Sequence, residues 1–339
     1  MSTIINNQYA DTTLTGIAAI LNPLGENQIL EFYTSSYRNL GMITEKASAL
    51  AEEPFTLQKY QPPPSPGGWE LGPLLPGTPL VVLKYNNQIR VYAISKYSKT
   101  GGNIILSVSP STAALDIATC IDAFTGTGDG KNQAWLYELE DKPIGRTVKE
   151  YPLMGDGSKV GKPKDVVLDG IGSGSRISAF YHNNSGVRYI VYQASDNKTL
   201  RWKPLSSKPG QANLLAGSFG GTTAPANNTL EDWTTHAGCA IEDTAFIFYV
   251  GSQELKINSV RQQVSKLYLI RSEFKYPSQD APEDLNVTCL PNGALSVVPI
   301  VNAEGTYDIV VFFMGEGDGG SRLLSKTVYP TGISSAGKA

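Results

Sequence analysis

Residues 237–249 read Ala-Gly-Cys-Ala-Ile-Glu-Asp-Thr-Ala-Phe-Ile-Phe-Tyr, and this stretch contains two apolar runs of strand length joined by a short polar turn. The first run is rich in small residues. The second run is rich in aromatic and β-branched residues, which favour strands. The pattern therefore predicts an antiparallel hairpin in which a small-residue strand precedes an aromatic strand.

The same order of runs recurs six times along the chain. The aromatic runs are 29–33, 88–92, 133–137, 188–192, 245–249 and 308–312. The small-residue runs that precede them are 16–20, 80–83, 116–120, 177–180, 237–241 and 295–298. A third strand is expected after most of these pairs, at 104–108, 147–151, 199–203, 267–271 and 322–328. One repeat thus consists of a strand, a hairpin, a second strand, a turn and a third strand.

This repeat has the strand order of a propeller blade, so the sequence predicts an all-β, lectin-like, six-bladed β-propeller. The small-residue strand would be innermost, near the axis, and the aromatic strand would pack between blades. A single domain would cover 1–339, with blades near 15–60, 79–111, 114–153, 174–205, 233–276 and 293–330. A β-sandwich or two stacked jelly rolls is the alternative, but neither gives a reason for the recurring order.

Composition narrows the class of protein. Charged residues make up 17% of the 339 residues and the net charge is −3, so we expect no nucleic-acid partner. Cys120, Cys239 and Cys289 are far apart, which indicates neither a zinc site nor a disulfide framework. No export signal or membrane span is recognisable, so we expect a soluble, cytoplasmic protein. The sequence leaves the oligomeric state open, a homodimer included.

Three long excursions interrupt the repeats. The first covers 52–78, is rich in Pro and contains Trp69; the others cover 206–229 and 251–264. Each is interpreted either as a connection between or within blades or as a loop that borders a site, because long loops in compact domains are often functional.

The runs Thr-Gly-Ile-Ala-Ala at 15–19 and Gln-Ile-Arg-Val-Tyr at 88–92 resemble blade segments of the fungal fucose-specific lectins, six-bladed propellers that bind sugar between adjacent blades. The resemblance implies that an Arg on the second strand, a Glu and an aromatic ring together hold each fucose. Arg90 occupies this position in its blade. The corresponding residues of the other five blades are Glu31, Trp135, Ile190, Ile247 and Val310. We therefore expect a lectin scaffold whose sugar sites are mostly lost.

The chain also resembles the lectin-fold fungal hetero-Diels–Alderases of tropolone–sesquiterpenoid biosynthesis, which act in eupenifeldin-, pycnidione- and xenovulene-type pathways. The likeness rests on overall length, on the lack of an export signal and on the degraded sugar motifs. It implies a pericyclase that requires neither a metal nor an organic cofactor. A hydroxymethyl tropolone would lose water to give an o-quinone methide, and a humulene-type sesquiterpene would capture it in an intermolecular [4+2] cycloaddition. The partners would be these small molecules.

Such a reaction needs hydrogen-bond donors for the tropolone and an aromatic or aliphatic wall for the terpene. The residues expected to act catalytically are Arg90, His182 and Arg188, and those expected to bind substrate are Tyr92, Trp135, Tyr181, Trp202, Trp233 and His236. The hypothesis is that Arg90, Tyr92, Trp135, His182 and Arg188 border one inter-blade or axial pocket. His182 and His236 are not expected to share a site. The competing interpretations are structural histidines, ion-paired arginines and tryptophans that pack between blades.

Other enzyme classes lack their motifs, because the sequence has no GxSxG elbow, HExxH pair, Walker loop or Rossmann GxGxxG after a strand. A propeller hydrolase with paired carboxylates from distant blades stays open. Three classes of function therefore remain: a cofactor-free pericyclase, a carbohydrate-binding lectin, and a structural or interaction propeller.

Overall fold

The structure is a computed structural model, and it describes residues 5–6, 16–25, 28–34, 40–46, 56–58, 74–75, 78–96, 102–110, 113–119, 123–143, 145–157, 160–166, 170–195, 200–205, 228–230, 233–257, 260–275, 282–316 and 322–335. Within these ranges the regular structure consists of antiparallel β-strands. No helix long and apolar enough to cross a membrane occurs among them.

The first three sheets follow one another along the chain. Sheet 1 contains β2 (Ile17–Leu21), β3 (Gln28–Thr34), β4 (Leu40–Lys46) and β5 (Thr56–Gln58). Sheet 2 contains β6 (Val81–Tyr85), β7 (Gln88–Lys96), β8 (Asn103–Ser109) and β9 (Ala113–Thr119). Sheet 3 contains β10 (Phe124–Gly128), β11 (Ala134–Lys142), β12 (Gly145–Pro152) and β13 (Lys164–Val166).

The last three sheets complete the set. Sheet 4 contains β14 (Ile177–His182), β15 (Val187–Gln193) and β16 (Leu200–Leu205). Sheet 5 contains β17 (Asn228–Thr229), β18 (His236–Ile241), β19 (Thr244–Ile257), β20 (Val260–Glu273) and β21 (Glu283–Thr288). Sheet 6 contains β22 (Leu295–Val301), β23 (Thr306–Glu316), β24 (Arg322–Ser334) and, at its outer edge, β1 (Ile5–Asn6).

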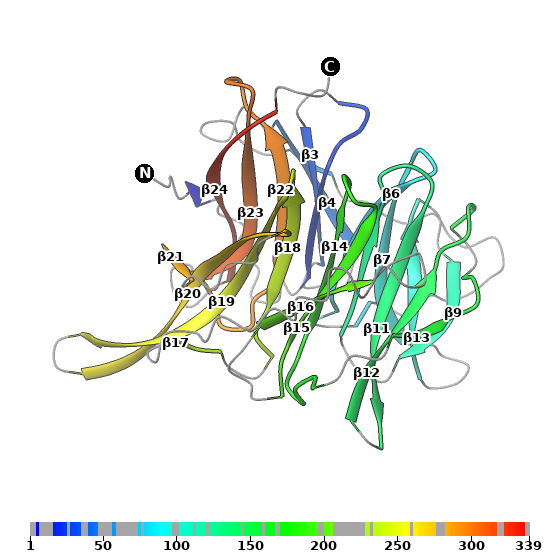
Figure 1. Ribbon diagram of the computed structural model, residues 1–339, viewed down its shortest axis with the longest axis horizontal. Coiled ribbons are helices and arrows are strands. Elements are labelled where there is room, and N and C mark those ends of the chain that lie inside the picture. Colours follow the sequence, from blue (N-terminus) through cyan, green and yellow to red (C-terminus); the bar gives the residue numbers. More distant parts are fainter. Residues whose placement is uncertain are drawn as a thin grey trace.

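The six sheets form a closed ring. Their first long strands contact one another in the order β2, β6, β10, β14, β18, β22 and back to β2. In Figure 1 the inner strands β14, β18 and β22 lie near the middle of the molecule, whereas the β19–β20 hairpin extends outward. Pairing of β1 with β24 joins the N-terminal part of the chain to the last sheet. The architecture is the predicted all-β, lectin-like, six-bladed propeller.

The hydrophobic core is divided among the interfaces between neighbouring sheets. One cluster of buried side chains lies between each pair of adjacent sheets, including sheets 6 and 1. The second strand of a sheet contributes large aromatic side chains to these clusters. Tyr92 lies between sheets 2 and 3, Tyr137 between sheets 3 and 4, and Phe248 between sheets 5 and 6. The prediction that aromatic strands pack between blades is confirmed for these residues.

Small residues on the inner strands allow the close approach of blades near the axis. A Cβ atom added at Gly126 of β10 would lie 2.8 Å from Cγ1 of Val81 on the neighbouring β6. A Cβ atom added at Gly238 of β18 would lie 2.8 Å from Cδ1 of Phe180 on β14. Both separations are too short for a real contact, so a side chain at either position would force its neighbour to shift.

Two predicted elements were wrong. Residues 116–119 belong to β9, the outer strand of sheet 2, and the inner strand of sheet 3 is β10 at Phe124–Gly128. The third blade therefore begins later than the predicted residue 114. Residues 251–257 and 260–264 belong to the long β19–β20 hairpin and are not a loop. Trp69 and nearly all of 206–229 lie outside the described residues, so their predicted roles as site-bordering loops stay predictions.

Candidate functional site

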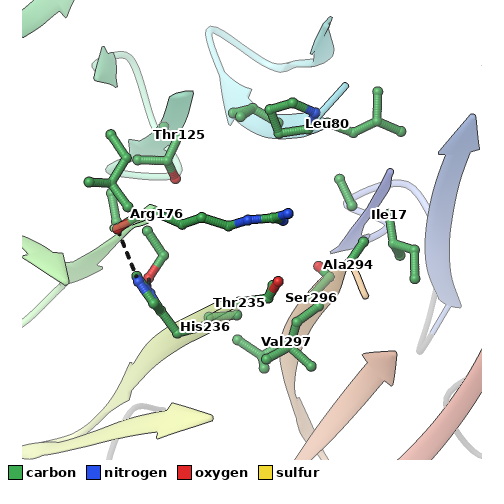
Figure 2. Close-up of a pocket in the computed structure, with 18 of the residues that line it drawn as sticks. Ile17, Leu80, Thr125, Arg176, Thr235, His236, Ala294, Ser296 and Val297 are labelled. Carbon is green, nitrogen blue, oxygen red and sulfur yellow. Dashed lines mark hydrogen bonds between the residues drawn. The ribbon is translucent and has the colours of Figure 1, made fainter. Parts of the chain in front are cut away.

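A cavity of about 210 Å³ lies on the axis of the ring. Every inner strand, or the residues that lead into it, contributes to its wall. Figure 2 shows this hollow and the strands that converge on it. Because the inner strands run side by side around the axis, the cavity wall is built from residues that lie far apart in the sequence.

The wall has an apolar part and a polar part. The apolar side chains include Ile17, Leu80, Val81, Phe124 and Leu295. The polar side chains are Thr125, Arg176, Ser178, Thr235, His236 and Ser296. A cavity of this kind can hold an apolar ligand body while a few placed donors orient its polar atoms.

Arg176 introduces a permanent positive charge into the cavity. It directly precedes β14, and Figure 2 shows its side chain extending across the hollow toward the side formed by Ile17 and Ala294. A guanidinium group remains protonated throughout the physiological pH range and offers donors in a planar fork. The cavity can therefore stabilise negative charge on a ligand oxygen.

His236 is buried in the polar part of the wall, and both of its ring nitrogens have partners. Nε2 lies 3.2 Å from the carbonyl oxygen of Arg176 and donates to it, because a carbonyl can only accept. Nδ1 lies 2.7 Å from Oγ of Ser178 and accepts from that hydroxyl. Burial lowers the pKa of His236 to about 4, so the imidazole is neutral near pH 7.

Ser296 and Thr235 differ in their hydrogen bonding. Oγ of Ser296 accepts a hydrogen bond of 2.9 Å from the backbone N–H of Ala19 and so connects sheets 6 and 1. Oγ1 of Thr235 is buried and makes no hydrogen bond to any described residue. Thr235 therefore has an unused hydroxyl donor in the wall of the cavity.

The predicted residues Arg188, Trp135 and Tyr181 come together between sheets 3 and 4. Nη1 of Arg188 donates a 2.7 Å hydrogen bond to Oε2 of Glu150, and both side chains are buried. Cζ of Arg188 lies 4.3 Å from the centre of the Trp135 ring. That ring stacks on Tyr181 with centroids 6.3 Å apart. In the sequence comparison, the position that corresponds to the lectin arginine in this blade is occupied by Ile190. Arg188 lies two residues before it.

Arg90 and Tyr92 lie in another interface, between sheets 2 and 3. The Tyr92 hydroxyl is 2.9 Å from that of Tyr85, and Cζ of Arg90 lies 5.6 Å from the centre of the Tyr85 ring. Arg90 also donates to Oε1 of Gln88. Burial raises the pKa of the Tyr92 hydroxyl far above its ordinary value, so this phenol remains protonated.

His182 ends β14 and lines a second cavity of about 180 Å³, together with Leu21 and Val301. Its ring stacks on Phe274 at 4.1 Å. Trp202 packs in the same aromatic group, 5.2 Å from Phe274. Trp233 is 41% exposed and lies 5.4 Å from Cζ of Arg146.

The hypothesis of one shared pocket is wrong. The five residues lie in three separate locations: Arg90 and Tyr92 between sheets 2 and 3, Trp135 and Arg188 between sheets 3 and 4, and His182 in the second cavity. The first four line neither of the two cavities described. Among the predicted site residues, His236 lines the axial cavity and His182 lines the second one. The expectation that the two histidines do not share a site agrees with this placement.

Sequence reasoning missed Arg176, Ser178, Thr235 and Ser296. The available signal was position, because Arg176 and Thr235 stand immediately before inner strands and Ser178 and Ser296 lie within them. A donor at the start of an inner strand lies beside the axis. No group of three or more potential metal ligands occurs in the part of the chain that the structure describes.

Comparison with known proteins supports the fold. Neither a known family nor a curated protein matches the chain in sequence. Among solved structures, AofleA from Arthrobotrys oligospora is similar, with 14% identity and a TM-score of 0.54 over 98% of this chain and 87% of that chain. A mutant of the Aleuria aurantia lectin, solved in complex with α-methyl-L-fucoside, has 15% identity and a TM-score of 0.56 over 98% of this chain and 100% of that chain.

A protein of unknown function from Dyadobacter fermentans is similar as well, with 8% identity and a TM-score of 0.57 over 97% of each chain. Identities this low establish a shared fold and no shared function. The chain therefore has the fold of the fungal fucose-lectin propellers.

Proposed function

We propose that this protein is a cofactor-free pericyclase that joins a tropolone-derived o-quinone methide to a humulene-type sesquiterpene by a hetero-Diels–Alder [4+2] cycloaddition in fungal meroterpenoid biosynthesis. The observation that carries the proposal is the axial cavity, whose wall combines apolar side chains with a cationic donor and several hydroxyl groups. The lectin-like propeller fold is consistent with the resemblance to the lectin-fold hetero-Diels–Alderases.

The reaction has two steps. In the first, the ring hydroxyl of the tropolone loses its proton, the exocyclic carbon–oxygen bond breaks, and the departing hydroxyl leaves with a proton as water. In the second, the alkene π electrons form a carbon–carbon bond to the exocyclic methylene and a carbon–oxygen bond closes the dihydropyran. No electrons are gained or lost overall, so the sequence of bonds formed and broken needs no redox partner.

The cavity supplies what these steps require. The Arg176 guanidinium stabilises negative charge on the tropolone oxygens and on the departing oxygen. The apolar residues of the wall, such as Leu80, suit the terpene partner better than water, which would otherwise add to the quinone methide. Holding both reactants in a near-attack arrangement can remove about 7–11 kcal/mol of the barrier by avoiding the entropy cost of association.

We infer the positions of the two reactants from the cavity volume. Pockets for drug-sized ligands usually measure about 300–1,000 Å³, so the cavity of about 210 Å³ fits the tropolone ring alone. The larger macrocycle would then approach through the mouth of the cavity, and its alkene would meet the exocyclic methylene there.

The test is incubation of the purified protein with a hydroxymethyl tropolone precursor and a humulene-type alkene. A control without protein measures the spontaneous reaction, and chiral chromatography with mass detection separates the adducts. We expect faster formation of one enriched stereoisomer. Adducts with the same rate and stereoisomer ratio as the control would refute the proposal.

Carbohydrate binding is the second candidate, and the Arg188, Glu150 and Trp135 group favours it. These are the three side-chain types that the lectin resemblance assigns to fucose, here placed between sheets 3 and 4. Titration with α-methyl fucoside tests this candidate. Saturable binding that is lost in an Arg188→Gln protein verified as folded by circular dichroism would support a retained sugar site, and the absence of saturable binding to the wild type would exclude it.

A further inference from the structure

The charged groups in the wall of the axial cavity have one sign. Arg176 reaches across the hollow, and no Asp, Glu or Lys is among the described residues that line it. His236 adds no second charge, because its buried imidazole is neutral and both ring nitrogens are engaged. An anion that enters the cavity is thus attracted by one guanidinium and repelled by no carboxylate of the wall.

Thr235 provides a second, independent feature. Its side chain is 7% exposed, and its buried Oγ1 has no hydrogen-bond partner among the described residues. Figure 2 shows the side chain within the hollow, on the same side as Ser296. A buried hydroxyl without a partner is unfavourable, and a ligand oxygen that accepts its hydrogen bond removes this cost.

The number of donors and the shape of the wall restrict the ligand. One guanidinium and one hydroxyl suit a monoanion with two neighbouring oxygens, whereas a dianion such as phosphate would need further cations. Ile17 and Leu80 flank the region that Arg176 reaches, so the remainder of the ligand must be apolar and small.

From this arrangement we infer that the polar part of the axial cavity is a binding site for a small planar organic monoanion, either an enolate or a carboxylate. Arg176 pairs with the charge and Thr235 donates a hydrogen bond to one oxygen. A second step rests on the proposed function: the tropolone binds in this site as tropolonate. This anion has the two neighbouring oxygens and a delocalised charge. The anion site itself does not depend on turnover.

Titration calorimetry with matched ligands tests the site. Tropolone is measured above the pH at which its hydroxyl ionises, and its neutral methyl ether is the control; benzoate and neutral benzyl alcohol form a second pair. We expect each anion to bind at least about 10-fold more tightly than its neutral counterpart, as charge-assisted hydrogen bonds require. Equal affinities for the anions and their neutral counterparts would overturn the inference.

Variants identify the residues. Arg176→Gln should weaken binding of the anions about 10- to 100-fold and leave the neutral ligands unchanged, and Arg176→Lys should restore part of the difference. The control Arg201→Gln changes an exposed arginine of β16 and should have no effect. Thr235→Val should weaken binding about 3- to 10-fold. Unchanged anion affinity in a folded Arg176→Gln protein contradicts the assignment.

The two proposals fail differently. Anion-selective binding without any accelerated adduct formation would retain the site and refute the pericyclase. Accelerated adduct formation by a protein that binds tropolonate and its methyl ether equally would retain the pericyclase and refute the anion site. The ligand comparison uses the wild-type protein, so it remains decisive even if a variant does not fold.

Discussion

His236 shows how a single residue connects two blades while it faces the axial cavity. Its Nδ1 accepts from Ser178 on β14, and its Nε2 donates to the backbone of Arg176. Both partners belong to sheet 4 or directly precede it, whereas His236 begins β18 of sheet 5. Protonation would place a buried positive charge beside the Arg176 guanidinium and would replace the Nδ1 acceptor by a donor, so the folded state favours the neutral ring.

This residue predicts a specific loss of stability in acid. The pKa of His236 is about 4 in the folded protein and 6.5 in the absence of burial. Between these values the unfolded chain binds the proton more readily, so stability decreases as pH falls from about 6.5 to about 4. The His236 contribution to this loss should total about 3 kcal/mol. Urea unfolding at several pH values measures it, and His236→Gln is the control that lacks this component. Parallel pH profiles of the two proteins would contradict the prediction.

The Arg188 and Glu150 pair gives a second prediction at the same scale. Because both side chains are buried, removal of one partner leaves an uncompensated charge. Arg188→Met should lower the free energy of unfolding by about 3–5 kcal/mol, and the double change with Glu150→Leu should recover most of that loss. Denaturant unfolding measures the double variant and the two single variants, Arg188→Met and Glu150→Leu. A double variant as unstable as the sum of the two single variants would show that the charges do not depend on each other.

Individual site residues were harder to predict from sequence than strands. Arg176 directly precedes a predicted strand and Arg188 begins one, but sequence spacing does not show which side chain faces the axis and which faces a neighbouring blade. The direction in which the side chain points depends on the pairing register of the strand. In this register Arg188 lies opposite Tyr181, and its side chain contacts Glu150. Glu150 comes from the preceding sheet, so its contact with Arg188 depends on how blades pack.

At the scale of elements, the aromatic runs were reliable because their large side chains fill the interfaces between sheets. All six runs lie wholly or almost wholly in second strands, β3, β7, β11, β15, β19 and β23. Small-residue runs were less reliable: Ala113–Thr119 resembles an inner strand in composition but is the outer strand β9. The sequence did not predict strands at 251–264, because the polar residues there lack the apolar pattern of a strand. The structure extends β19 and β20 through this region by continuous backbone pairing.

Inner strands should tolerate added bulk poorly. Gly238→Ala should lower stability by about 1–3 kcal/mol, because the new methyl group would overlap Phe180 on the neighbouring strand. Gly155→Ala is the control, since this glycine is exposed and its methyl group would meet only the end of the Asn86 side chain, at 3.1 Å. Thermal unfolding compares the two variants with the wild type. Equal stability of both variants would show that the inner strands separate easily.

At the scale of the whole molecule, the number of blades and the all-β class could be predicted because a repeated pattern determines them. The axial cavity could not, because its wall combines residues from 17 to 297 that become neighbours only when the ring closes. The cavity also brings together apolar side chains, a guanidinium and the Thr235 hydroxyl, which has no hydrogen-bond partner among the described residues. The proposed function therefore depends on the assembled ring and not on any single motif.

The most direct measurement of the central claim compares the wild type with a variant whose axial cavity is filled. Ala294→Phe adds a ring at a position that lines the hollow, and circular dichroism verifies that the variant folds. With a hydroxymethyl tropolone precursor and a humulene-type alkene, the wild type should form one enriched stereoisomer faster than the protein-free control. The filled variant should lose at least about 10-fold in rate, together with the enrichment. Equal rate and stereoisomer ratio in the folded variant and the wild type would contradict the assignment of the reaction to this cavity.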